Sequence, residues 1–63
     1  MTQKELLYVE DAIEHETSII SICEETIKNL TNQATVSFIE HEITKHNETK
    51  ENLMNLLEGN NEW

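Results

Sequence analysis

The chain has 63 residues with 13 acidic side chains, four lysines and no arginine, and its formal net charge is −9. This charge argues against a nucleic-acid-binding protein, which needs clustered basic side chains for its phosphate contacts, and against a basic helix on a membrane surface. A single cysteine forms no internal disulfide, and the sequence has no proline and one glycine. Length and composition together predict one small domain built from long helices.

The first predicted helix covers residues 3–30. It begins at Thr2 and Glu5, whose spacing predicts a capping box in which each side chain satisfies a backbone N–H group of the other residue. Apolar residues then recur at heptad spacing and form a wide apolar stripe, typical of a bundle helix. The two rows of this stripe are Leu6, Ile13, Ile20 and Ile27, and Val9, Glu16, Cys23 and Leu30, with Tyr8, Ala12, Ile19 and Ile22 widening it on one side.

A turn over residues 29–33 leads into the second predicted helix, which covers residues 33–58. Thr31 or Asn32 is expected to cap this helix, because short polar side chains accept hydrogen bonds from its first N–H groups. The rows continue as Val36, Ile43, Lys50 and Leu57, and as Ile39, His46 and Leu53, flanked by Phe38, Met54 and Leu56. Gly59 is expected to end the helix in a left-handed conformation, and the tail over residues 59–63 is expected to fray.

Two antiparallel helices joined by a short turn predict an all-α hairpin that forms a single domain over residues 1–63. A lone hairpin of this size leaves much of its apolar stripe exposed to water, and the sequence has no disulfide framework or zinc motif that would stabilise it. We therefore predict a homodimer in which two hairpins form a four-helix bundle, with domain-swapped and tetrameric forms as alternatives. The predicted dimer core is Leu6, Val9, Ile13, Ile20, Cys23, Ile27, Leu30, Val36, Ile39, Ile43, Leu53 and Leu57.

Polar residues interrupt the apolar rows near the middle of both helices. Glu16 lies level with His46 in an antiparallel hairpin, and Lys50 lies one turn further along the second helix. We interpret Glu16, His46, Lys50 and His15 as a polar core layer that sets the register of the bundle at some cost in stability. Cys23 is expected to be a small apolar filler in the same core.

The polar layer also has an alternative interpretation as a metal site. A dimer would offer Glu16, Glu42 and His46 twice, and these four carboxylates and two imidazoles are the ligand inventory of di-iron bundles. However, Glu42 and His46 are four residues apart rather than three, and the Lys50 ammonium would repel a cation. The expectation is no cofactor, with iron, manganese or zinc as the alternative. No nucleophile with an oriented base and no phosphate-binding loop is visible, so an enzyme is not expected.

Several short motifs resemble a known family. The run KELLYVEDA at residues 4–12, followed by His15-Glu16, resembles the opening of short spore-coat or ferritin-like proteins of spore-forming Firmicutes. Similar spacings follow at residues 29–30, 38–39, 45–46 and 56–57, so the resemblance covers about residues 4–57. It implies a ferritin-like hairpin that dimerises and acts in the spore coat or during sporulation. The family offers no catalytic residues, and Gln33 stands where similar sequences often have proline.

The sequence therefore predicts a non-enzymatic structural or assembly protein that associates through its apolar stripe. Its expected partner is a second copy of itself, with other coat or assembly proteins as further candidates and without nucleic acid or membrane. We expect it in the cytoplasm or in the coat of the sporulating cell rather than secreted, because no signal peptide is recognisable. The alternatives are the small metal-binding bundle and an adaptor whose hairpin pairs with helices of another protein.

Overall fold

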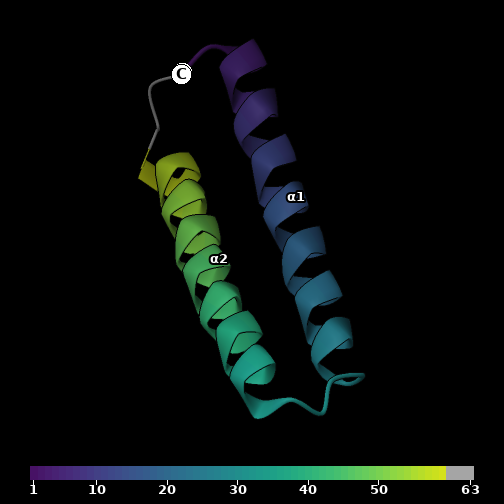
Figure 1. Cartoon of the computed structure of the whole chain (residues 1–63). Helices are drawn as coiled ribbons and strands as arrows, with labels where there is room; N and C mark the ends of the chain where they lie inside the picture. The colour runs from purple at the N-terminus through teal and green to yellow at the C-terminus, as the bar shows by residue number, and fades with distance from the viewer. Residues whose placement is uncertain (60–63) are drawn as a thin grey trace.

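Two long helices make up most of the computed structural model, which describes residues 1–59 (Figure 1). Helix α1 covers Gln3–Ile27 and helix α2 covers Gln33–Gly59. The helices run antiparallel and side by side, and the chain turns at residues 28–32. The predicted all-α hairpin is thus confirmed over the described residues. Neither helix within this range has the length and apolar character that crossing a membrane requires.

Helix α1 begins with the capping box that the sequence predicts. The backbone N–H of Glu5 donates to the Thr2 hydroxyl at 3.0 Å, and the backbone N–H of Thr2 donates to Glu5 Oε1 at 2.8 Å. The backbone hydrogen bond first, and then the Thr2 hydroxyl, lower the pKa of the Glu5 carboxyl. The contribution of the ionised carboxylate is therefore complete at neutral pH and is lost as the pH falls through the lowered pKa.

Helix α1 ends at Ile27, three residues before the predicted end. The N–H of Asn29 donates to the Thr26 carbonyl at 3.0 Å and the N–H of Leu30 donates to the Ile27 carbonyl at 3.1 Å, so the last turn tightens. The side-chain amide of Asn29 also donates to the Glu25 carbonyl at 3.1 Å. Asparagine competes for backbone partners in this way, which explains why the apolar pattern alone placed the end too late.

Asn32 caps helix α2. Its side-chain oxygen accepts a hydrogen bond from the Thr35 N–H at 3.0 Å, and its backbone carbonyl accepts from the Val36 N–H at 3.0 Å. At the other end, Gly59 belongs to the helix, and no glycine in the described part of the chain has a positive φ. The predicted left-handed stop at Gly59 is therefore wrong. Residues 60–63 of the predicted frayed tail lie outside the described residues.

We expect Asn32→Ala to lower the free energy of unfolding by about 1 kcal/mol, because the first turn of α2 loses a partner for its N–H groups. Chemical denaturation followed by circular dichroism at one fixed protein concentration measures this loss. Asn47→Ala is the matched control, since Asn47 is exposed in the middle of α2 and alanine is the better helix former there. Equal losses in both variants would show that Asn32 is not a cap.

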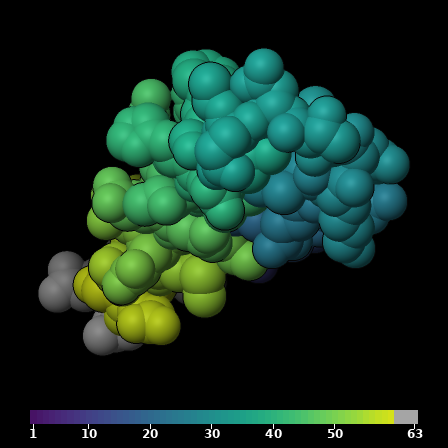
Figure 2. Space-filling model, turned by 60° about the horizontal axis from the view of Figure 1, so that its bottom comes forward, coloured from purple at the N-terminus to yellow at the C-terminus, as the bar shows by residue number. Residues whose placement is uncertain are grey.

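The two helices pack along the predicted heptad rows. We call the rows the seam: Leu6, Val9, Ile13, Glu16, Ile20, Cys23, Ile27 and Leu30 in α1, and Val36, Ile39, Ile43, His46, Lys50, Leu53 and Leu57 in α2. Every seam residue is half-buried, and none of residues 1–59 is fully buried. Figure 2, seen from the turn end, shows side chains of both helices in direct contact. The hairpin therefore has a seam but no enclosed core.

Candidate functional site

At the middle of the seam, the carboxylate of Glu16 meets the imidazole of His46. His46 Nδ1 lies 2.6 Å from Glu16 Oε2. A carboxylate oxygen accepts hydrogen bonds, so the tautomer that fits this contact carries its hydrogen on Nδ1 and donates a hydrogen bond to Glu16. The side chain of Glu16 is 15% exposed and that of His46 is 31% exposed. Among residues 1–59, this contact is the one side-chain hydrogen bond that joins α1 to α2.

The surroundings of this pair explain what it contributes. Ile13 and Ile20 lie one turn on either side of Glu16, and Ile43 and Lys50 lie one turn on either side of His46. Both partners are half-buried, so water has limited access and the hydrogen bond is stronger than on an open surface. Both groups still reach solvent on one side, which keeps the cost of desolvation below that of a fully buried ion pair. A slip of one helix by a turn would separate the two groups. The pair therefore favours a single register of α1 against α2.

The other residues of the predicted polar layer have different surroundings. Lys50 is half-buried in the seam, whereas His15 is exposed and has no hydrogen bond to the pair among the described residues. Glu42 is half-buried, and its carboxylate lies 3.7 Å from the ammonium of Lys45. One chain thus brings Glu16 and His46 together and leaves His15 outside.

The residues of the predicted metal alternative do not form a ligand set within one chain. In the part of the chain that the structure describes, no three His, Cys, Asp or Glu side chains gather closely enough to hold a metal ion. Glu42 faces Lys45 in an ion pair, one turn away from His46. A metal site with Glu16, Glu42 and His46 would therefore need ligands from a second chain. Cys23 is a free, half-buried thiol in the seam.

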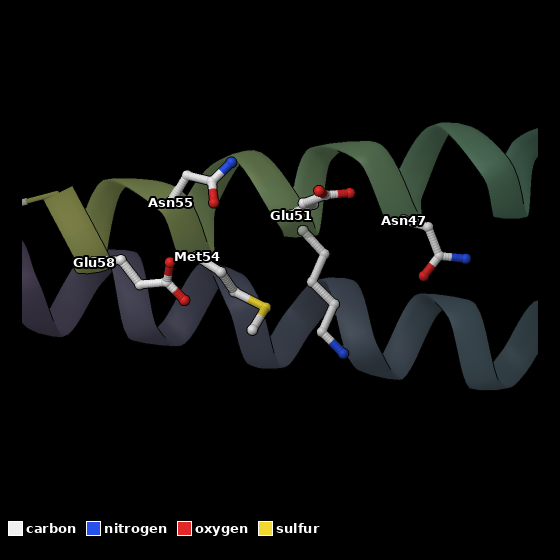
Figure 3. A pocket seen from close by; sticks show the side chains of 6 residues that line it. Asn47, Glu51, Met54, Asn55 and Glu58 are labelled. Atoms are coloured by element: carbon white, nitrogen blue, oxygen red, sulfur yellow. The ribbon is translucent and has the colours of Figure 1, made fainter.

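The hollows on the surface are open. One of them lies along α2 alone and is lined by Asn47, Lys50, Glu51, Met54, Asn55 and Glu58 (Figure 3). Met54 reaches from there toward α1, where it lines a second hollow with Glu10, Ile13 and Glu14. This contact places Met54 on the same side of the hairpin as the Glu10 and Glu14 carboxylates.

Large apolar side chains that the seam does not cover gather on the other side. In α1, residues that alternate four and three positions apart, from Tyr8 to Thr26, form one stripe next to the seam. Residues with the same spacing form a second stripe in α2, from Phe38 to Leu56. Equivalent flanks of two antiparallel helices lie on one side of a hairpin, so both stripes share one face. We call it the apolar face: Tyr8, Ala12, His15, Ile19, Ile22 and Thr26 with Phe38, Glu42, Lys45, Thr49, Asn52 and Leu56.

The apolar face is exposed and carries little net charge. Its five large apolar side chains, Tyr8, Ile19, Ile22, Phe38 and Leu56, are between 37% and 65% exposed. The only formally charged groups in this set are Glu42 and Lys45, which pair with each other. Glu5 lies beyond the end of the stripe. This face therefore presents apolar surface without a charge that repels another acidic chain.

The opposite flank of the hairpin, which we call the acidic face, has the reverse character. It contains Leu7, Glu10, Glu14, Thr17, Ser21, Glu24 and Lys28 with Ser37, Glu40, Thr44, Asn47, Glu51, Met54 and Glu58. Six glutamates against one lysine give it a net charge of −5. Leu7 and Met54 are its only large apolar side chains. Two such faces would repel each other, so this side favours contact with water.

The rows of the predicted dimer core lie in the seam within one chain. The residues that widen or flank the predicted stripe are the ones that remain exposed. The signal that distinguishes them is a second heptad repeat, offset from the first by one position on the helix. A helix that carries two such repeats can contact two neighbours, one through each repeat.

Comparison with known proteins gives no further assignment. No protein-family model, no curated protein and no solved structure matches the chain. The family named from the short motifs at residues 4–57 stays a prediction of the sequence.

Proposed function

We propose that this protein is a non-enzymatic structural or assembly protein whose hairpin pairs with a second copy to form a four-helix bundle. One observation carries the proposal: none of residues 1–59 is buried, while five large apolar side chains are exposed on one face. A chain this short without disulfides gains little stability from a single seam. A second copy would cover the apolar face and turn the half-buried seam into an enclosed core.

The distribution of charge supports a second copy as the partner. Each chain has a net charge of −9, so two copies repel each other except where charge is sparse. The apolar face meets this condition, because its two charged groups neutralise each other. A basic partner would instead fit the acidic face. Self-association through the apolar face thus buries apolar surface and keeps the carboxylates in water.

The assembly role follows from the sequence resemblance. A spore-coat type of function rests on the motifs at residues 4–12 and on those that follow them, and a ferritin-like bundle agrees with the antiparallel hairpin. In such a bundle the acidic faces point outward on both sides. They would then be available to other coat or assembly proteins, and the packed bundle itself would be the functional unit.

A second candidate function is a metal-binding bundle, and the geometry of the central pair favours it. Glu16 holds His46 through Nδ1, which leaves Nε2 as the ring nitrogen that could bind iron, manganese or zinc. Glu42 of both copies would complete such a site. Elemental analysis of protein purified without chelator separates the two candidates. Stoichiometric metal that disappears in Glu16→Ala would favour the metal-binding bundle, and its absence would favour the structural role.

A matched pair of variants tests the self-association. Ile22 on the apolar face is 65% exposed and Leu7 on the acidic face is 63% exposed, so glutamate at either position perturbs one chain about equally. We expect the wild-type protein to have the mass of two chains by sedimentation equilibrium. Ile22→Glu should raise the dissociation constant at least about 30-fold, because an unpaired charge is buried in each copy.

Leu7→Glu is the control and should keep the dissociation constant of the wild-type protein. Circular dichroism at high concentration would verify that both variants are helical. Equal weakening by both substitutions would mean that the apolar face is not the specific contact. A wild-type protein with the mass of one chain throughout would refute the proposed function.

A further inference from the structure

We propose that the two copies meet apolar face to apolar face with their turns at opposite ends, so that α1 lies on α1 and α2 lies on α2. This inference rests on the proposed dimer and adds its orientation. Two hairpins related by a two-fold axis have one other face-to-face arrangement, in which both turns lie at the same end and each α1 lies on α2 of the other copy.

The hairpin itself shows which positions of the apolar face lie at one height. The Glu16–His46 contact sets the register, and the numbers of these two residues add to 62. Residues of α1 and α2 whose numbers add to 64 therefore lie within two residues, about 3 Å, of the same height. Every stripe position in α1 has such a nearly level counterpart in α2. These counterparts are Tyr8 with Leu56, Ala12 with Asn52, His15 with Thr49, Ile19 with Lys45, Ile22 with Glu42, and Thr26 with Phe38.

With both turns at the same end, these level counterparts would become the contacts between copies. Ile19 would face the Lys45 ammonium, and Ile22 would face the Glu42 carboxylate. Both charges would lose water against isoleucine side chains, which offer no hydrogen bond in return. Phe38, one of the most exposed apolar side chains, would face the hydroxyl of Thr26. Ala12 would face the amide of Asn52 as well, so this arrangement pairs apolar groups with polar groups at four of six positions.

With the turns at opposite ends, each stripe meets its own reversed copy, and the pairing becomes complementary. In α1, Ala12 faces Ile22, His15 faces Ile19, and Tyr8 faces Thr26. In α2, Phe38 faces Leu56, Lys45 faces Thr49, and Glu42 faces Asn52. Ala12 thus lies opposite the larger Ile22, Phe38 meets Leu56 at each end, and both charges face groups that form hydrogen bonds. Two of the six pairings, Tyr8 with Thr26 and His15 with Ile19, join an apolar to a polar group.

The two helices agree on the position of the symmetry axis. The reversed pairing centres on position 17 in α1 and on position 47 in α2. These two numbers add to 64, so both centres lie within two residues of one height of the hairpin. This follows from the level pairing of the two stripes, and the arrangement is therefore compatible with a single two-fold axis.

Distances between spin labels at the turn test the orientation directly. A single cysteine is obtained with Cys23→Ser and Thr31→Cys, and the label then lies in the turn (Figure 1). Position 31 is 14 residues from the axis, and in the proposed arrangement the two labels lie on opposite sides of it. Their separation is therefore about 28 residues along the bundle, or about 42 Å at 1.5 Å per residue. With both turns at one end, the labels would be separated by less than about 20 Å, the width of neighbouring helices.

A label at Ser18 is the control for the dimer itself. Ser18 is exposed and lies one residue from the height of the axis, so both arrangements give a measurable distance there. About 42 Å at position 31 supports the proposal. A distance below about 20 Å overturns the orientation and leaves the dimer intact. Absence of a distance at position 18 refutes the dimer, and with it both proposals.

A double-mutant cycle gives a second test that leaves Cys23 in place. Phe38 and Leu56 are 18 residues apart in one helix, about 27 Å, so they meet only across copies. In the proposed orientation, Phe38→Ala and Leu56→Ala affect one contact, and the dissociation constant of the double variant departs at least about twofold from the product of the single effects. Independent effects would contradict the proposal.

Discussion

Replacing Glu16 with leucine should leave the thermal stability unchanged or raise it by up to about 1 kcal/mol. The substitution removes the hydrogen bond to His46, but it places an apolar side chain of similar volume among the apolar residues of the seam. Thermal unfolding followed by circular dichroism, at the same concentration as the wild type, measures the change.

Glu16→Ala should have the opposite effect and lower the free energy of unfolding by about 1–2 kcal/mol. It removes the same hydrogen bond but leaves a cavity beside His46 instead of filling the space. The two variants should therefore differ by roughly 2 kcal/mol although each loses the same polar contact. For a chain of this size such a difference corresponds to a shift of about 8–16 °C in the thermal midpoint.

The gain in Glu16→Leu should reduce the specificity of assembly. A polar pair at one height penalises bundles with another register or number of chains, and leucine removes this penalty. Native mass spectrometry should therefore find additional oligomers in Glu16→Leu and a single dominant species in the wild type. If Glu16→Leu unfolds the protein while His46→Leu does not, the two residues do not act as a pair.

Much of the hairpin was predictable because its signals are local. The Thr2 and Glu5 pair predicts the start of α1, and the structure contains both hydrogen bonds of this capping box. The antiparallel register predicts that Glu16 and His46 lie level, and in the structure His46 Nδ1 lies 2.6 Å from Glu16 Oε2. These features depend on sequence spacing and on the short turn, both of which are visible without a structure.

The errors lie where neighbouring groups compete. Helix α1 ends at Ile27 because the side-chain amide of Asn29 donates a hydrogen bond to a carbonyl of the last turn. The spacing of apolar residues does not predict such a hydrogen bond. Gly59 can adopt a left-handed conformation but is not obliged to, and it continues α2. In both cases the residue type is compatible with two local structures, and the sequence alone does not decide between them.

The division of the apolar residues between two surfaces was not predictable from either helix alone. A stripe as wide as that of α1 indicates more than one neighbour, but the rotation of each helix decides which part faces α2. The structure fixes this rotation through the seam. Ile20 then lies inside the seam and Ile19, its neighbour in sequence, lies on the apolar face.

The dependence of thermal stability on protein concentration tests the dimer most directly. If folding and association are coupled, each tenfold increase in concentration stabilises the folded dimer by about 1.4 kcal/mol. From 1 μM to 1 mM, on the order of a thousandfold, the unfolding midpoint should therefore rise by at least about 10 °C. Helicity should decrease at the lowest concentrations, because a separated hairpin has no enclosed core.

Circular dichroism melts across this range, with the mass measured in the same samples, give the decisive result. A dimer whose folding and association are coupled has a midpoint that rises with concentration and a mass that changes from one chain to two. A midpoint that is independent of concentration, in a fully helical protein with the mass of a single chain, would contradict it.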